Sequence, residues 1–186
     1  LKDSKKSSAV ENFMRIFFLH AANLSDFNEM VFQAYEDQGI TLKRPYTNNF
    51  YIFRDRIGIQ GHVDLCANPE LVLEGFLQIG RLKTINGFDF ESMKKIREAA
   101  LKIDPKFFLS QTAGNQFIEI LKSQSSLSTI LKKMKQLGIL KLLIPEFGAI
   151  EGQMQFDMFH IYSVDEHTFK VVRNMRQMQI GKTDGS

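Results

Sequence analysis

Residues 144–167 read IPEFGAIEGQMQFDMFHIYSVDEH, and the rest of the chain is organised around this stretch. Lysine-rich amphipathic segments precede it, whereas the stretch itself is spaced by glycines and ends in a charged sequence. Two of the chain's four histidines, His160 and His167, lie in it together with Asp157, Asp165 and Glu166. Imidazole and carboxylate groups are common metal ligands and acid–base groups in proteins. The stretch is therefore the first place to look for chemistry, and the remainder is interpreted as scaffold.

A helix is predicted to begin at the end of this stretch. Ser163 and Glu166 have the spacing of a capping box, in which both side chains satisfy backbone N–H groups of the first turn. His167 then falls in that turn. Apolar residues at helical spacing predict the buried side of the helix: Val164, Val171, Met175 and Met178. On spacing alone, a surface or half-buried histidine is the plainer alternative to a metal ligand.

Complete catalytic and metal-binding motifs are missing from the sequence. It has no HxxxH, HExxH or paired-cysteine pattern, no His followed directly by Asp, and no glycine-rich phosphate loop. Asp89 and Glu91 form a D-x-E pair, but a helix-capping role for Asp89 explains this pattern better. Cys66 has no nucleophile motif around it. We therefore predict that the chain contains no catalytic and no cofactor-binding residue.

The composition is that of a globular chain of one domain, or one domain plus part of another: 44% of its 186 residues are hydrophobic and 24% are charged. A formal net charge of +3 is too small to predict a nucleic-acid surface. Lys132, Lys133 and Lys135 are interpreted as the solvated face of a helix.

The single cysteine excludes an intramolecular disulfide and favours a cytoplasmic location. No apolar run reaches the roughly 18 residues that span a membrane. Because the N-terminus lacks both an initiator Met and a signal peptide, we expect an internal fragment of a longer protein.

Residues 9–37 predict one long helix or two. Phe13, Phe27 and Met30 widen the apolar stripe beyond a strict coiled-coil seam, so we expect this segment to pack into a globular core or bundle. Gly39 supplies a stop. The seam itself consists of apolar residues at heptad spacing with Asn28 as its polar member: Val10, Met14, Phe17, Ala21, Leu24, Val31 and Tyr35.

The remaining chain predicts a small hairpin and further helices. Apolar residues alternate over 50–59 around a polar centre, which is typical of a hairpin. With about five to seven helices expected from the apolar periodicity, the fold class is all-α, an irregular helical bundle with one small β-hairpin. Residues typical of helix termini are Asn68-Pro69, Asp89, Asp104-Pro105 and Ser126 or Ser128 at starts, and Gly138 at an end.

The segment LLIPEFGAIEGQMQFDMFHIYSVDEHTFKVVRNM, residues 142–175, resembles the GlnD family of bifunctional PII uridylyltransferase/uridylyl-removing enzymes. In that family such a sequence marks the start of an HD phosphohydrolase domain. The upstream segments DFNEMVFQAYED, RDRIGIQG, NPELVLEGFLQIGR and MKQLGILKLLIPEF follow in the order that the family uses. The resemblance extends over residues 9–180, most of the chain.

The resemblance implies two parts. Residues 1–149 correspond to the helical linking domain that follows a nucleotidyltransferase domain, and residues 150–186 to the truncated N-terminal part of the HD domain. His167 corresponds to the first metal-ligand histidine of the HD pattern. Asp157 keeps the family's aspartate, whereas Phe156 stands where the family usually has histidine. The later His-Asp pair and final Asp of the HD pattern do not occur in this chain, nor do the Gly-Ser loop and Asp pair of the transferase.

The activity implied by the resemblance is regulation of nitrogen metabolism by a multifunctional enzyme. The transferase attaches UMP from UTP to the regulatory protein PII at low glutamine. The HD hydrolase removes it at high glutamine with a divalent metal, Mg or Mn. PII is thus the implied partner, while UTP and glutamine act through domains absent from this chain. Because one histidine cannot assemble a metal site, we predict that the chain alone binds no metal stably and is inactive.

Two other functions stay open on the sequence alone. The first is a non-catalytic helical interaction module that docks a partner such as PII. The second is a part of a related nucleotidyltransferase-linked regulator with another protein substrate. For the truncated HD part, residues 150–186, we expect exposure of Met175 and Met178, which would favour dimerisation.

Overall fold

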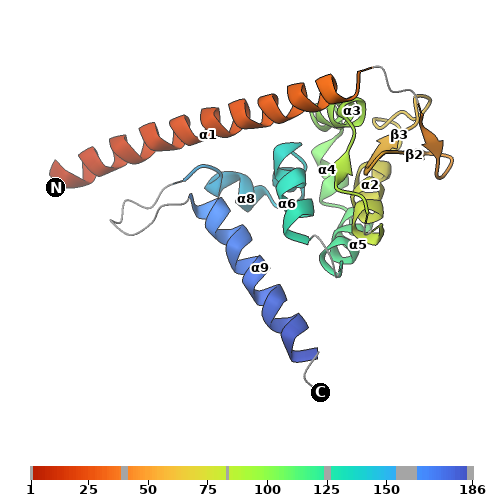
Figure 1. Cartoon of the computed structure of the whole chain (residues 1–186). Coiled ribbons are helices and arrows are strands. Elements are labelled where there is room, and N and C mark those ends of the chain that lie inside the picture. The colour runs from red at the N-terminus through yellow and green to blue at the C-terminus, as the bar shows by residue number, and fades with distance from the viewer. Residues whose placement is uncertain (1, 39–41, 83, 124–126, 154–162, 184–186) are drawn as a thin grey trace.

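The computed structural model describes residues 2–38, 42–82, 84–123, 127–153 and 163–183, with the backbone alone for 2–8 and 179–183. In Figure 1, α1 runs along the top of the molecule and its N-terminal part extends beyond the other elements, while α9 points away below. The predicted class, an irregular helical bundle with one hairpin, is confirmed. The elements in chain order are α1 (Lys2–Glu36), β1 (Arg44–Pro45), β2 (Phe50–Phe53), β3 (Arg56–Ile59), α2 (Glu70–Arg81), β4 (Gly87–Phe88), α3 (Phe90–Ala100), α4 (Pro105–Phe108), α5 (Gln111–Leu121), α6 (Leu127–Gln136), α7 (Leu140–Leu143), α8 (Pro145–Ile150) and α9 (Val164–Thr183).

The predicted hairpin is β2–β3, and two short strands enlarge it to a sheet with the order β1-β2-β3-β4. Arg54 lies in the hairpin turn with φ of 55°. Tyr51 of β2 stands opposite Gly58 of the antiparallel β3, and Ile57 pairs with Phe88 of the parallel β4. β1 and β4 have two residues each, too few for an alternating pattern to reveal them.

The hydrophobic core is centred on α2, which packs against α5, α6 and β3. The rings of Phe76 and Phe88 meet edge to face with their centroids 5.1 Å apart. Gly75 allows this approach, because a Cβ atom there would lie 2.7 Å from Cε1 of Phe88. The apolar helix predicted after Pro69 is therefore the element on which the sheet rests.

The helix termini predicted from Asp89, Asp104 and Gly138 are confirmed. Each aspartate accepts a hydrogen bond of 2.9 Å from a backbone N–H group two or three residues later, and so caps α3 or α4. Gly138 follows α6 with φ of 77°, a conformation that glycine adopts without strain.

Other predicted termini differ from the structure. Asn68 does not cap α2: its side-chain amide donates to the backbone oxygen of Asp64 at 3.1 Å, so the preceding turn occupies it. α2 has no side-chain cap. Ser128 lies inside α6 and is not its N-cap. Ser126 and Gly39 lie outside the described residues.

The N-terminal segment forms one long helix, but the side of α1 predicted to be buried is wrong. Phe17, Leu24 and Val31 of the heptad seam are exposed. Of the predicted stripe, Met30 packs against the core. The side of α1 that faces the other helices also carries polar residues such as Gln33, whose side-chain amide donates to the backbone oxygen of Phe88 at 2.9 Å. Heptad spacing identifies an apolar stripe but does not say which neighbour covers it.

The predicted buried side of α9 is also wrong. Val171, Met175 and Met178 are exposed, whereas Asp165 and Phe169 are buried. The exposure of Met175 and Met178 agrees with what is expected for a truncated domain. Dimerisation through these residues stays a prediction.

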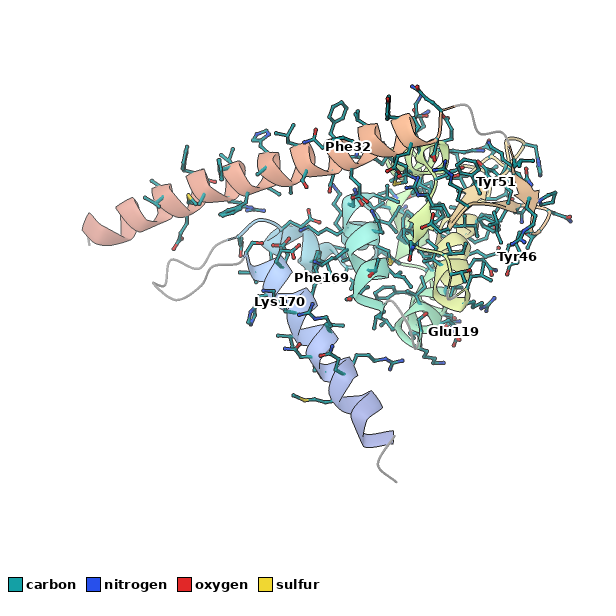
Figure 2. The ribbon with its side chains drawn as sticks, viewed as in Figure 1. Phe32, Tyr46, Tyr51, Glu119, Phe169 and Lys170 are labelled. Atoms are coloured by element: carbon teal, nitrogen blue, oxygen red, sulfur yellow. The ribbon has the colours of Figure 1, made fainter. Side chains whose placement is uncertain are left out.

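The core continues from the helical body into α9. Phe169 of α9 lies towards α8 (Figure 2), with its ring centroid 5.4 Å from that of Phe147. The domain boundary predicted between residues 149 and 150 lies within this packed region and stays a prediction. Among the described residues, no helix has the length and apolar character needed to cross a membrane.

Candidate functional site at the junction of α6, α8 and α9

His167 lies in the first turn of α9 with an exposed side chain. Its backbone N–H donates to the oxygen of Ser163 at 2.9 Å, so the helix start predicted there is confirmed. The acidic residues beside it, Asp165 and Glu166, form ion pairs with lysines of α6. The other residues predicted from this stretch lie outside the described part of the chain: Phe156, Asp157 and His160.

Asp165 is the anchor of the junction. It is only 1% exposed, and its Oδ2 forms an ion pair with Nζ of Lys135 from α6. Its Oδ1 accepts a hydrogen bond of 3.3 Å from the backbone N–H of Gly152. A hydrogen bond with the Ser163 side chain adds a third partner. The protein thus replaces the water that this carboxylate loses on burial.

The charges of this pair stabilise each other. Burial alone would raise the pKa of Asp165, but the hydrogen bonds from Lys135 and Ser163 outweigh it and hold this pKa below its ordinary value. Burial likewise lowers the pKa of Lys135, but Asp165 and Glu166 outweigh that effect and raise it above its ordinary value. Both groups therefore stay charged through the neutral range.

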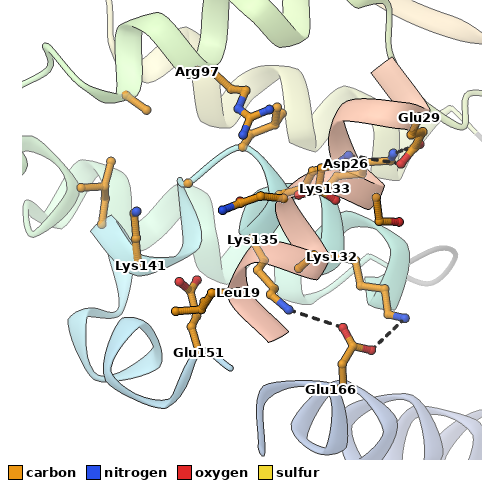
Figure 3. A pocket seen from close by; sticks show the side chains of 18 of the residues that line it. Leu19, Asp26, Glu29, Arg97, Lys132, Lys133, Lys135, Lys141, Glu151 and Glu166 are labelled. Atoms are coloured by element: carbon orange, nitrogen blue, oxygen red, sulfur yellow. Dashed lines mark hydrogen bonds and ion pairs between the residues drawn. The ribbon is translucent and has the colours of Figure 1, made fainter. Parts of the chain in front are cut away.

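Glu166 adds a second contact between α9 and α6. Its Oε2 lies 3.3 Å from Nζ of Lys132, and its Oε1 lies 3.5 Å from Nζ of Lys135 (Figure 3). The carboxylate expected to close a capping box thus pairs with the neighbouring helix. The predicted start of α9 is confirmed, but the Glu166 side chain contacts lysines of α6.

The prediction that three lysines of α6 form a solvated face is wrong for two of them. Lys132 is mostly exposed, but Lys133 pairs with Glu29 of α1 and Lys135 pairs with α9. Lys135 follows the buried Leu131 by four residues, so both share one face of the helix. That spacing could have identified Lys135 as a residue at the edge of the core.

Gly152 brings α1 to the same junction. It has φ of 68°, and a Cβ atom there would lie 2.9 Å from Cγ of Leu19 and 3.2 Å from the backbone oxygen of Arg15. The Arg15 side chain donates from Nε to the backbone oxygen of Glu151 at 3.3 Å. Any larger residue at position 152 would be strained and would also push against α1.

A cleft with a volume of about 930 Å³ opens beside the junction, between α1, α3 and α6 (Figure 3). Burial is the main cause of a raised pKa for Asp26 and for Glu151 in this cleft. Because both acidic and basic side chains line it, the cleft does not select for a polyanion such as a nucleoside triphosphate. Its charged side chains are Asp26, Glu29, Glu151, Glu166, Arg97, Lys132, Lys133, Lys135 and Lys141.

The described residues do not by themselves fit a metal ion. No group of three or more His, Cys, Asp or Glu side chains in the described part of the chain could hold one. The carboxylates nearest to His167 in sequence, Asp165 and Glu166, are engaged by lysines. His167 could serve only as one ligand of a site that other residues complete.

The fold and this junction define a class of protein: a helical domain that holds the first turn of a following helix through a buried ion pair. A family model described as "Uridylyltransferase GlnD third domain" matches residues 50–142. The chain belongs to the GlnD uridylyltransferase family.

Curated relatives agree with this family. The chain is 32% identical over 179 residues to the bifunctional uridylyltransferase/uridylyl-removing enzyme of Acinetobacter baylyi, an alignment that covers 92% of this chain and 20% of that relative. It is 30% identical to the enzyme of the same name from Azotobacter vinelandii, over 95% of this chain and 20% of the relative. The chain thus spans about a fifth of the length of the curated relatives that it matches. No solved structure matches it.

Proposed function

We propose that this chain is the central helical region of a bifunctional uridylyltransferase/uridylyl-removing enzyme. It would link the nucleotidyltransferase domain to the HD hydrolase domain, whose first part lies within residues 150–186. The observation that carries the proposal is the match of 92% and 95% of the chain to curated enzymes that bear this name. The whole protein would act in the cytoplasm, adding UMP to PII at low glutamine and removing it at high glutamine.

His167 would contribute the first metal ligand of the hydrolase. His167 lies in the first turn of α9, at an exposed position. The junction formed by Lys135 and Asp165 would hold that turn at a fixed place on the helical domain. When bound, a divalent Mg or Mn ion would supply the activated water for hydrolysis.

The 186-residue chain alone would neither transfer nor remove UMP. A hydrolytic metal centre needs several ligands, and one histidine holds an ion too weakly. Incubation of uridylylated PII with this chain and Mn²⁺ should release no UMP. Metal-dependent release would overturn this part of the proposal, and binding of PII without release would favour the interaction module.

The site assignment is tested in the full-length enzyme with His167→Ala. This variant should lose uridylyl removal at least about a hundredfold, since loss of a metal ligand weakens the metal site, and should keep uridylyl transfer. Asn174→Ala, at an exposed position of the same helix, is the matched control and should retain both activities. Normal uridylyl removal by the His167 variant would refute the assignment.

A further inference from the structure

The outer face of α1 is a broad apolar surface in the described structure. We define this face by six exposed side chains: Phe13, Phe17, Leu24, Phe27, Val31 and Tyr35. Phe13 is 67% exposed and Phe27 is 60% exposed. Their positions recur at steps of three, four and seven residues, which places them along one side of the helix. α1 therefore presents to solvent the kind of stripe that a helix normally buries.

The orientation of α1 is fixed from the opposite side. Gln33 is 6% exposed and donates to the backbone oxygen of Phe88, and Glu29 forms an ion pair with Lys133 of α6. In the N-terminal half of the helix, Arg15 donates to the backbone oxygen of Glu151, which follows α8. Rotating α1 to bury the outer face would break all of these contacts. Within the described structure, the side of α1 that carries Arg15, Glu29 and Gln33 faces the protein, and the outer face is exposed to solvent.

The width of the outer face indicates what would cover it. At about 100° per residue, the six side chains together with Val10 and Ile16 occupy about 120° of the helix circumference. A single partner helix in a coiled coil covers a narrower seam, whereas a stripe this wide fits the groove between two helices. A second copy of this chain would bring only one further α1. The outer face thus matches a layer of helices better than a two-stranded coiled coil.

Relatives of this chain are long enough to supply such a layer. About four fifths of the length of the curated relatives lies outside the region that matches this chain, which covers 20% of them. We propose that further helices of the same, longer polypeptide cover the outer face of α1. The helix would then be shared by two layers: the side that carries Gln33 and Glu29 packs on the domain described above, and the outer face packs on the additional helices.

Photo-crosslinking in the full-length protein tests this proposal. The photoreactive residue p-benzoylphenylalanine would replace Phe27 and, in a second variant, Phe13, so that a folding defect at one position does not decide the result. Leu109 is the matched control, because it is also exposed but lies in the connection after α4. Mixing ¹⁴N- and ¹⁵N-labelled protein distinguishes crosslinks within one chain from crosslinks between two copies.

The expected result at either α1 position is a crosslink within one chain to a peptide outside residues 1–186, several-fold more abundant than at Leu109. Crosslinks between two copies would overturn the proposal in favour of a dimer. Absence of crosslinks, or crosslinks to residues 42–183 alone, would also overturn it. The outcome does not depend on enzymatic activity, so it is separate from the test of His167.

Discussion

The substitution Lys135→Met isolates the ion pair that joins α6 to α9. Methionine keeps an unbranched apolar side chain and removes the charged Nζ, which lies 5.9 Å from the ring centroid of Phe169. Asp165, at 1% exposure, would then keep only the hydrogen bonds from Gly152 and Ser163. Removing one partner of a buried ion pair costs about 3–5 kcal/mol. Because the Lys135 side chain is 21% exposed and Asp165 keeps other donors, we expect about 2–3 kcal/mol.

The directions of the two pKa shifts predict how the stabilisation by this ion pair depends on pH. The pKa of Asp165 is lower in the folded chain than its ordinary value, so the stabilisation is present above about pH 4 and is lost as the pH falls through the folded pKa. The pKa of Lys135 is raised, so the stabilisation is also present below about pH 10 and is lost only at a higher pH. The free-energy difference between wild type and variant should therefore be constant from about pH 5 to pH 9 and shrink below about pH 4.

Urea unfolding of the 186-residue chain, followed by circular dichroism, measures these free energies. Lys132→Met is the control: its side chain is 55% exposed, so loss of its ion pair with Glu166 should cost less than about 0.5 kcal/mol. Adding Asp165→Asn to Lys135→Met should recover part of the loss, because no charge is then left buried without a partner. Equal losses for the two lysine variants, or strictly additive effects in the double variant, would refute the reasoning.

Three further substitutions test local packing by the same unfolding assay. Gly58→Ala should cost about 2 kcal/mol or more, since its Cβ would lie 2.1 Å from Cζ of Tyr51 across the hairpin; a cost below about 0.5 kcal/mol would contradict this contact. Gly152→Ala should cost about 2 kcal/mol, because alanine is strained at φ of 68° and its Cβ atom would approach Leu19. Adding Leu19→Ala to this variant should recover part of the cost, and no recovery would show that backbone strain accounts for all of it. Asp89→Ala should cost about 2–3 kcal/mol, because it removes both the cap of α3 and the hydrogen-bond acceptor of the Tyr51 hydroxyl. Burial is the main cause of the raised pKa of Tyr51, and the hydrogen bond to Asp89 adds to it. The same change should therefore lower this pKa part of the way towards its ordinary value of about 10, and an unchanged ultraviolet titration would speak against this hydrogen bond.

Features that depend on a few neighbouring residues could be predicted from the sequence. Asp89 and Gly138 mark helix ends because capping involves only the adjacent turn, and both predictions are confirmed. The hairpin around Arg54 is likewise local. Asn68 shows the limit of this reasoning, because an equally local contact with Asp64 competes for the same side chain.

Features that depend on distant partners could not be predicted. The apolar stripe of α1 is visible in the sequence, but the neighbours that cover or expose it are not. The sequence predicts Lys135 to be a surface residue, because its partner, Asp165, is 30 residues away and belongs to another helix. The position of His167 could be assigned to the first turn of α9, because a helix start depends only on neighbouring residues.

The contact between Arg15 and the backbone of Glu151 has a consequence for synthesis of the chain. The two residues are separated by 136 positions in sequence. At a translation rate of about 5–20 residues per second, α1 is made roughly 7–27 s before the residue that Arg15 contacts. Lys133, the ion-pair partner of Glu29, is likewise made late, 104 positions further on. α1 therefore leaves the ribosome long before these contacts can form, and its amphipathic surface stays open to chaperones during that interval.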